Sequence, residues 1–249
     1  MAKSTSIFRL ISALLPLSVL LAPHLTTKVW AEHQVVAAFE PPPGKGAPHG
    51  GTIGGGSRPV GRACLSSPSA TSGSLTALSP GRRLGLTQAD RPNFLVYIPQ
   101  TTAQTAEFSL FDEQMNGIYQ VSIPVPKAGL VSIPLPDAVP VLAKDKPYYW
   151  TVALACNPSD RTEDLVVGGW IERAEPNDNL KQQLASVAAI EKVSLYAKQG
   201  FWYDAVTTLV ELQHTEPNNL KLTTTWAELL KSVGLDAIAS KPLALAVSR

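Results

Sequence analysis

The feature that most constrains the fold is a change of hydrophobic period near residue 175. Before it, short apolar segments alternate with polar residues or end at Pro and Gly, at residues 94–98, 107–111, 118–123, 130–135, 148–156 and 165–171. Short strands at such spacing favour a sandwich or barrel. After it, apolar residues recur every three or four positions, which indicates helices. We therefore predict an α+β protein: an antiparallel β-sandwich of about seven or eight strands over residues 61–175, then a packed C-terminal bundle of two or three helices over residues 176–243, folded with the sandwich as one unit.

Glycines predict where two of the helices end. One helix face is predicted from the spacing of Leu180, Leu184, Val187, Ile190 and Ala197. Gly200 follows in a position suited to a left-handed turn. In such a cap, Phe201 returns to contact Tyr196. A second helix begins near Trp202 and ends or turns at Pro217.

The third helix leaves two starts open. It begins either near Leu220 or at Thr225. The second start is suggested by Thr225 and Glu228, which have the spacing of a capping box. Gly234 repeats the glycine cap, which would bring Leu235 onto Leu230.

Residues 1–31 have the order of a secretory signal peptide. Lys3 and Arg9 precede an apolar run over residues 11–22, and Val29 and Ala31 flank a cleavage-site tryptophan. The run is short for a membrane span. We predict an exported protein, periplasmic or extracellular, which is held at the membrane only if the signal stays uncleaved. The Pro- and Gly-rich residues 32–60 then form a flexible tether.

Charge and motifs argue against nucleic acid and nucleotide partners. Without Lys3, Arg9 and Lys28, the 21 basic residues fall to 18 against 20 acidic ones, a net charge of −2. Such a chain lacks the basic footprint of a nucleic-acid-binding protein. The glycines at 51–56 have phosphate-loop spacing, but Ser57 follows where the motif needs Lys. We expect no nucleotide and no cofactor.

Cys64 and Cys156 are the two cysteines of the chain. An even count in an exported protein predicts a disulfide, and two buried free thiols are the alternative. A bridge closing a loop of this length would stabilise the fold by about 4–5 kcal/mol in the chain-entropy model.

No set of residues predicts catalysis. The histidines offer no nucleophile–base pair, so no catalytic residue is assigned. Asp160, Glu163 and Asp164 form a weak calcium candidate in a loop that otherwise reads as a solvated strand connection. A carboxylate-dependent hydrolase would use two carboxylates facing one cleft, from residues such as Asp112, Glu113, Asp160 or Glu163, and the separation of the carboxylates in space decides whether it is possible.

The aromatic residues suggest a binding edge. Trp202 and Tyr203 are neighbours at a helix start and cannot face the same way, so one of them is expected at a groove, with Asp204 beside it. The three would recognise a peptide or a glycan at the junction of sandwich and helices. The alternative is that both aromatics pack that junction.

Two resemblances bear on the C-terminal half and the whole chain. Residues 190–217 look like a single tetratricopeptide-like hairpin, carried by Tyr196, Gly200, Trp202, Ala205, Leu209 and Pro217. A wider set resembles a secreted cyanobacterial family catalogued as domain of unknown function 928: residues 54–58, 75–78, 106–110, 149–150, 168–173, 195–197, 202–205 and 226–230. This resemblance implies an envelope location and a shared fold but no reaction.

The leading hypothesis is an exported cell-envelope protein that binds a protein or peptide partner without catalysis. The alternatives are a carboxylate-dependent hydrolase and a glycan-binding module acting on envelope polymers.

Overall fold

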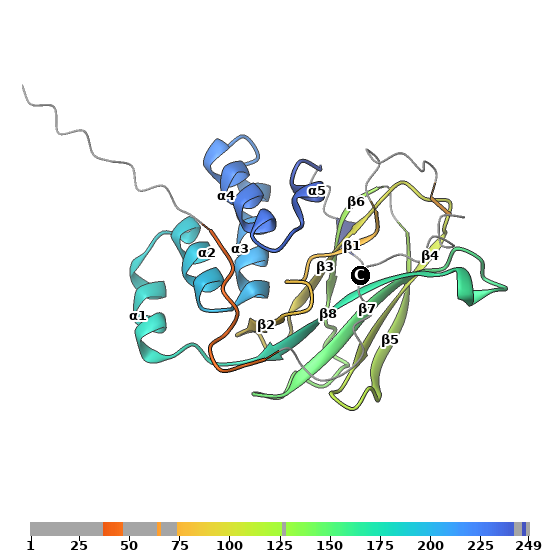
Figure 1. The fold of residues 1–249 in the computed structure, drawn as a ribbon, viewed down its shortest axis with the longest axis horizontal. Coiled ribbons are helices and arrows are strands. Elements are labelled where there is room, and N and C mark those ends of the chain that lie inside the picture. Colours follow the sequence, from red (N-terminus) through yellow and green to blue (C-terminus); the bar gives the residue numbers. More distant parts are fainter. Residues whose placement is uncertain (1–36, 47–63, 66–73, 126–127, 242–245, 248–249) are drawn as a thin grey trace, which may run out of the picture. The chain divides into compact units, whose positions relative to one another are not determined.

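The computed structural model describes residues 37–46, 64–65, 74–125, 128–241 and 246–247, and these form two sheets and a set of helices (Figure 1). The predicted signal peptide lies outside the described residues, as does most of the predicted tether. Residues 35–249 belong to one compact unit.

The larger sheet has five strands in the order β2 (Leu84–Thr87), β8 (Leu165–Arg173), β7 (Pro147–Leu154), β4 (Thr105–Phe111) and β5 (Gly117–Pro124). Its central pairs are antiparallel, whereas β2 runs parallel to β8. The smaller sheet has the order β1 (Thr76–Ala77), β3 (Asn93–Ile98), β6 (Gly129–Pro134) and β9 (Ala246–Val247). Its last pair is also parallel.

The α+β class and the sandwich therefore hold, but the sheets are not wholly antiparallel. β2 meets β8 from far along the chain, and β9 returns after the helices, so neither edge is fixed by a hairpin. The two sheets meet through aromatic rings. Phe94 of β3 lies 4.9 Å from Phe108 of β4 and 5.3 Å from Trp150 of β7, measured between ring centroids.

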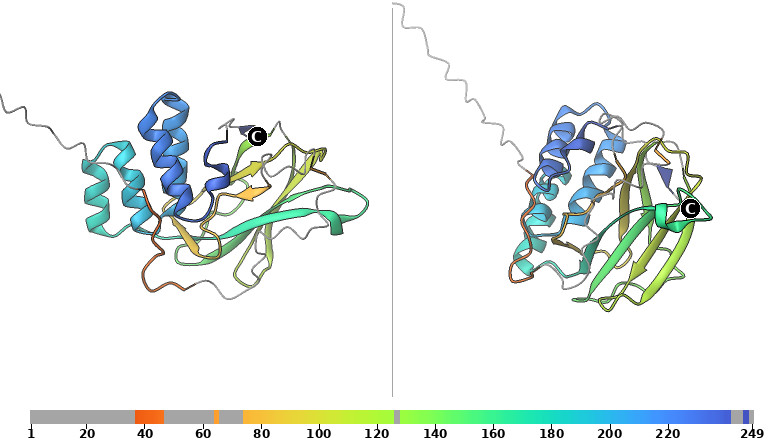
Figure 2. Two further views of the ribbon diagram at one scale, coloured as in Figure 1. Left: turned by 45° about the horizontal axis from the view of Figure 1, so that its top comes forward. Right: turned by 45° about the vertical axis from the view of Figure 1, so that its right-hand side comes forward.

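The helices are α1 (Asp178–Ser186), α2 (Ala189–Lys198), α3 (Trp202–Thr215), α4 (Leu220–Lys231) and the short α5 (Asp236–Ala239) (Figure 2). These are more than the predicted two or three helices: Val187 and Ala188 are extended and divide the first expected helix into α1 and α2, and the short α5 follows α4. The apolar spacing continues across this break, so periodicity alone does not reveal it.

Of the two predicted starts for the third expected helix, Leu220 and Thr225, the structure has the first. Asn219 caps the helix through Lys221 N, so the helix begins at Leu220. The capping box is wrong, because the Thr225 hydroxyl donates to Lys221 O inside the helix.

Both glycine caps are confirmed. Gly200 has φ +80°, Phe201 N donates to Tyr196 O at 2.9 Å, and the two rings lie 6.3 Å apart. Gly234 has φ +79°, and Leu235 N donates to Leu230 O at 2.9 Å. The α2–α3 hairpin formed around Gly200 packs through α3 on β2.

Residues 37–46 correct the predicted tether. Ala37 and Phe39 are buried, and Phe39 packs edge-on against Trp202 at 5.4 Å between centroids. Further along, Lys45 forms an ion pair with the buried Glu172 of β8. Ala37 and Phe39 thus belong to the hydrophobic core, and Glu40 N donates to Ala197 O of α2 at 3.0 Å.

The disulfide between Cys64 and Cys156 is present and confirms the predicted pairing, with a sequence separation of 92. Among the described residues, no helix is both long and apolar enough to cross a lipid bilayer.

Candidate functional site

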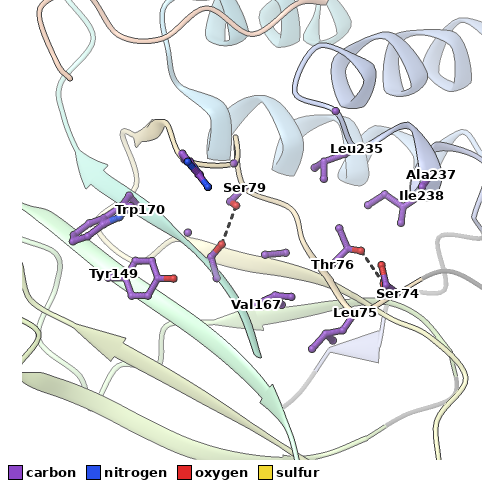
Figure 3. A pocket seen from close by; sticks show the side chains of 16 residues that line it. Ser74, Leu75, Thr76, Ser79, Tyr149, Val167, Trp170, Leu235, Ala237 and Ile238 are labelled. Atoms are coloured by element: carbon purple, nitrogen blue, oxygen red, sulfur yellow. Dashed lines mark hydrogen bonds between the residues drawn. The ribbon is translucent and has the colours of Figure 1, made fainter. Parts of the chain in front are cut away.

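A pocket of about 470 Å³ lies where the sandwich meets the helical region (Figure 3). Three segments line it: residues 74–82 around β1, the Gly168–Trp170 stretch of β8 with Tyr149 of β7, and residues 234–238 at α5. The volume falls within the range of small-ligand pockets.

Two adjacent glycines of β8 allow these segments to approach closely. A Cβ on Gly169 would lie 2.4 Å from Ser79 Cβ, well inside van der Waals contact. The Ser79 hydroxyl donates to Gly168 O at 3.1 Å and holds the chain after β1 against β8 (Figure 3). The glycines therefore set the depth of the pocket on this side.

Hydrogen-bond donors without partners line the pocket. The side chains of Tyr149 and Trp170 are 3% exposed, with ring centroids 5.0 Å apart. Among the described residues, neither the Tyr149 hydroxyl nor the Trp170 indole N–H has a hydrogen-bond partner. Burial raises the pKa of Tyr149, so its hydroxyl stays protonated.

Arg82 supplies the charge. It is exposed, it lines the pocket, and it forms no ion pair within the part of the chain that the structure describes. No carboxylate is among the lining residues. The remaining wall is apolar, formed by Leu75, Val167 and Ile238 with their neighbours. The arrangement suits an anionic group attached to an apolar body.

The predicted recognition pair is not at this surface. Trp202 is 0% exposed and Tyr203 4% exposed, which corrects the expectation that one of them lies at a groove. Trp202 donates through its indole N–H to Leu78 O at 2.8 Å. The Tyr203 hydroxyl accepts from Trp150 Nε1 at 2.8 Å and donates to Trp170 O at 3.0 Å. Both aromatics join the sandwich to the helices, as the alternative interpretation expected.

Asp204 lies outside the pocket lining, in the first turn of α3. Its carboxylate accepts from Gln88 N at 3.1 Å, so it fixes the chain after β2 to the helix. Burial raises the pKa of Asp204 to about 7.

The loop that contains the calcium candidates Asp160, Glu163 and Asp164 is stabilised by hydrogen bonds and ion pairs. Asp160 accepts from Thr162 N and from its hydroxyl, and Arg161 pairs with Asp164 and Glu107. In the described residues, no group of three or more His, Cys, Asp or Glu is arranged to hold a metal ion.

The hydrolase candidates fall into two groups, one in each of two loops, and the groups do not meet. Asp112 follows Phe111, which pairs with Tyr149, whereas the loop of Asp160 follows Leu154, which pairs with Ala106. The two pairs of carboxylates thus lie at opposite ends of the sheet, five residues or about 17 Å apart along the strands. Paired glycosidase carboxylates lie within about 10 Å.

A glycan platform would need a row of exposed aromatics. Trp150 and Trp170 are both buried, and the exposed large apolar side chains of the described residues are Met115, Ile118, Val141 and Leu220. The structure brings together none of the predicted site residues in the pocket. The Gly-Gly-Trp sequence at 168–170 was the one available signal, because paired glycines in a strand mark a close approach.

Comparison with known families matches a family model, Domain of Unknown Function (DUF928), over residues 53–243. No curated protein and no solved structure matches the chain. The match includes β1 to α5, and hence every segment that lines the pocket. The chain belongs to the DUF928 family.

Proposed function

We propose that the protein is an exported, noncatalytic binding module of the cell envelope, and that it binds a protein or peptide partner at the junction pocket. The observation that carries the proposal is the pocket itself, where the Arg82 guanidinium and the hydrogen-bond donors of Tyr149 and Trp170 face an apolar wall. A ligand that accepts hydrogen bonds from these donors is held in one orientation against the apolar wall.

The lining supports binding rather than hydrolysis. Its hydroxyl groups include Ser74, Thr76 and Ser79, but no histidine or carboxylate lines the pocket to activate them. The Ser79 hydroxyl is engaged with Gly168 O. A nucleophile needs an adjacent base, so these hydroxyls serve as pocket walls.

Export rests on the first 31 residues and on the disulfide. A disulfide between Cys64 and Cys156 suits an oxidising compartment outside the cytoplasm. The mass and N-terminal sequence of the protein from fractionated cells test this. We expect a chain that starts at Glu32 in the envelope or medium, and an intact chain in the cytoplasm would overturn the assignment.

Site-specific crosslinking tests the binding role. Ala237 lines the pocket and is exposed, so it accepts a photoreactive residue without loss of Arg82. Met115, 43% exposed in the β4–β5 connection, is the matched control. In intact cells we expect one protein adduct at position 237 that is absent at position 115. Identical adducts at both positions, or none at 237, would contradict the proposal.

A further inference from the structure

The outer edge of β1 lies along the pocket. β1 is the terminal strand of its sheet, with β3 on one side and no strand on the other. Residues 74–77 line the pocket, whereas no residue of β3 does. The pocket therefore borders β1, the edge strand, and not β3.

The backbone of Ala77 is free at the outer edge of β1. Leu78 N donates to Leu95 O at 2.9 Å, which makes 78 and 95 a hydrogen-bonded pair. Because such pairs alternate in antiparallel ladders, the N–H and C=O of Ala77 point to the outer edge. Neither group has a hydrogen-bond partner among the described residues. An extended chain can pair with them, as in strand addition to a sheet edge.

The charge of the pocket selects one end of such a chain. Arg82 lies past β1 on the same lining segment, and the Tyr149 hydroxyl and Trp170 indole add neutral donors. In Figure 3 the Tyr149 hydroxyl points away from the Trp170 ring toward the side where Val167 and Thr76 lie. A guanidinium with further donors, in a pocket with no carboxylate among its lining residues, is suited to a carboxylate ligand.

We propose that the pocket binds the free C-terminal carboxylate of an extended peptide, which pairs with the outer edge of β1 and buries an aliphatic last side chain against Leu75, Val167 and Ile238. This inference rests on the proposed binding function and names the chemistry of its partner. The chain's own C-terminal strand does not fill this role in the same molecule. β9 lies at the opposite edge of the sheet, three strand spacings or about 14 Å from β1.

The probe is a library of hexapeptides with free C-termini, selected on the oxidised exported protein. We expect enrichment of Val, Leu or Ile at the last position. The enriched peptide is then compared with its C-terminal amide by fluorescence anisotropy. Loss of one charge-assisted interaction predicts at least about tenfold weaker binding of the amide.

Two variants test whether Arg82 binds the C-terminal carboxylate of the peptide. Arg82→Gln is expected to weaken the free acid about tenfold and to leave the amide unchanged, so that the two bind equally. Lys192→Gln removes the same charge on α2, outside the pocket lining, and should change neither affinity. Arg82 is exposed and Lys192 is partly exposed, and thermal melts of the two variants establish that they fold.

Backbone substitution tests the strand pairing. Methylation of the one peptide nitrogen that donates to Ala77 O should weaken binding, whereas methylation of its two neighbours, which face away from β1 in an extended partner, should not. A uniform response to methylation would overturn strand addition.

The outcomes separate the two proposals. A partner that crosslinks at Ala237 but binds equally as acid and amide, or ignores Arg82, overturns the carboxylate site and leaves the binding function standing. A selection with no enriched peptide, or displacement of the peptide by octanoate at lower concentration than by the peptide itself, overturns the peptide assignment. No adduct at Ala237 removes the proposed function and this inference with it.

Discussion

Gly169→Ala tests how the pocket and the domain junction are held together. The added Cβ would lie 2.4 Å from Ser79 Cβ, 2.8 Å from Ser79 Oγ and 3.3 Å from the Tyr203 hydroxyl oxygen. Carbon atoms in contact are normally about 3.5–4.0 Å apart, so more than about 1 Å of overlap must be relieved. Rotation of Ser79 moves Oγ but not Cβ, so the chain after β1 has to shift away from β8.

The cost follows from these contacts. Overpacking of this kind destabilises by about 1–3 kcal/mol. The shift also breaks the bond from the Ser79 hydroxyl to Gly168 O, which contributes about 1 kcal/mol. The free energy of unfolding should fall by about 2–4 kcal/mol in total. For a chain of this size, that lowers Tm by about 4–16 °C.

Urea and thermal unfolding of the oxidised protein, followed by tryptophan fluorescence, measure the effect. Gly117→Ala is the control, since a Cβ there meets no atom within 4 Å and φ is not in the left-handed region. Ser79→Gly removes both clashing atoms, so the double variant should recover most of the loss attributed to overlap. If the free energies of unfolding of Gly169→Ala and Gly117→Ala differ by less than about 0.5 kcal/mol, the close approach of Gly169 to Ser79 is not what holds the chain after β1 against β8.

Three further predictions concern the core and its pH dependence. Replacing Cys64 and Cys156 by Ser should lower the free energy of unfolding by about 4–5 kcal/mol, because the bridge spans 92 residues, and denaturation with and without reductant measures it. Tyr203→Phe leaves the Trp150 indole N–H buried without an acceptor, so we expect a loss of about 2–3 kcal/mol in urea unfolding; a loss below about 0.5 kcal/mol would contradict this hydrogen bond. The pKa of Asp204, about 7, lies above its ordinary 3.8, so its contribution to stability is complete below pH 3.8 and is lost as pH rises through 7. Asp204→Asn should therefore flatten the decline of Tm between pH 5 and 8, and an unchanged slope would refute the assignment.

The central strands follow from the sequence because their alternation is strong. β7 was expected at residues 148–156 and runs over Pro147–Leu154, and β3 to β6 and β8 differ from expectation by a few end residues. β1 and β2 were not expected. Leu84–Thr87 is buried at every position and so has no alternation to detect, and β1 has two residues.

The site shows a different limit. The sequence predicts a binding site at the junction of sandwich and helices, but it places that site at Trp202 and Tyr203, because adjacent aromatics on a helix cannot share a face. In the structure, Trp202 meets Leu78 O and the residue 37–46 segment, while Tyr203 meets Trp150 and Trp170, so both faces of the helix start are covered. Burial by a segment more than 150 residues away leaves no local signal.

Features with local causes follow from the sequence alone: the alternating strands, the helix periodicity, the left-handed caps at Gly200 and Gly234, and the single possible pairing of two cysteines. The tertiary structure decided which edges pair in parallel, where residues 37–46 pack, and that residues 74–82, 168–170 and 234–238 meet around one pocket. Local elements depend on neighbours within a few residues along the chain, whereas the pocket depends on three distant segments, and their meeting is set by how the sheets and helices bury their faces together.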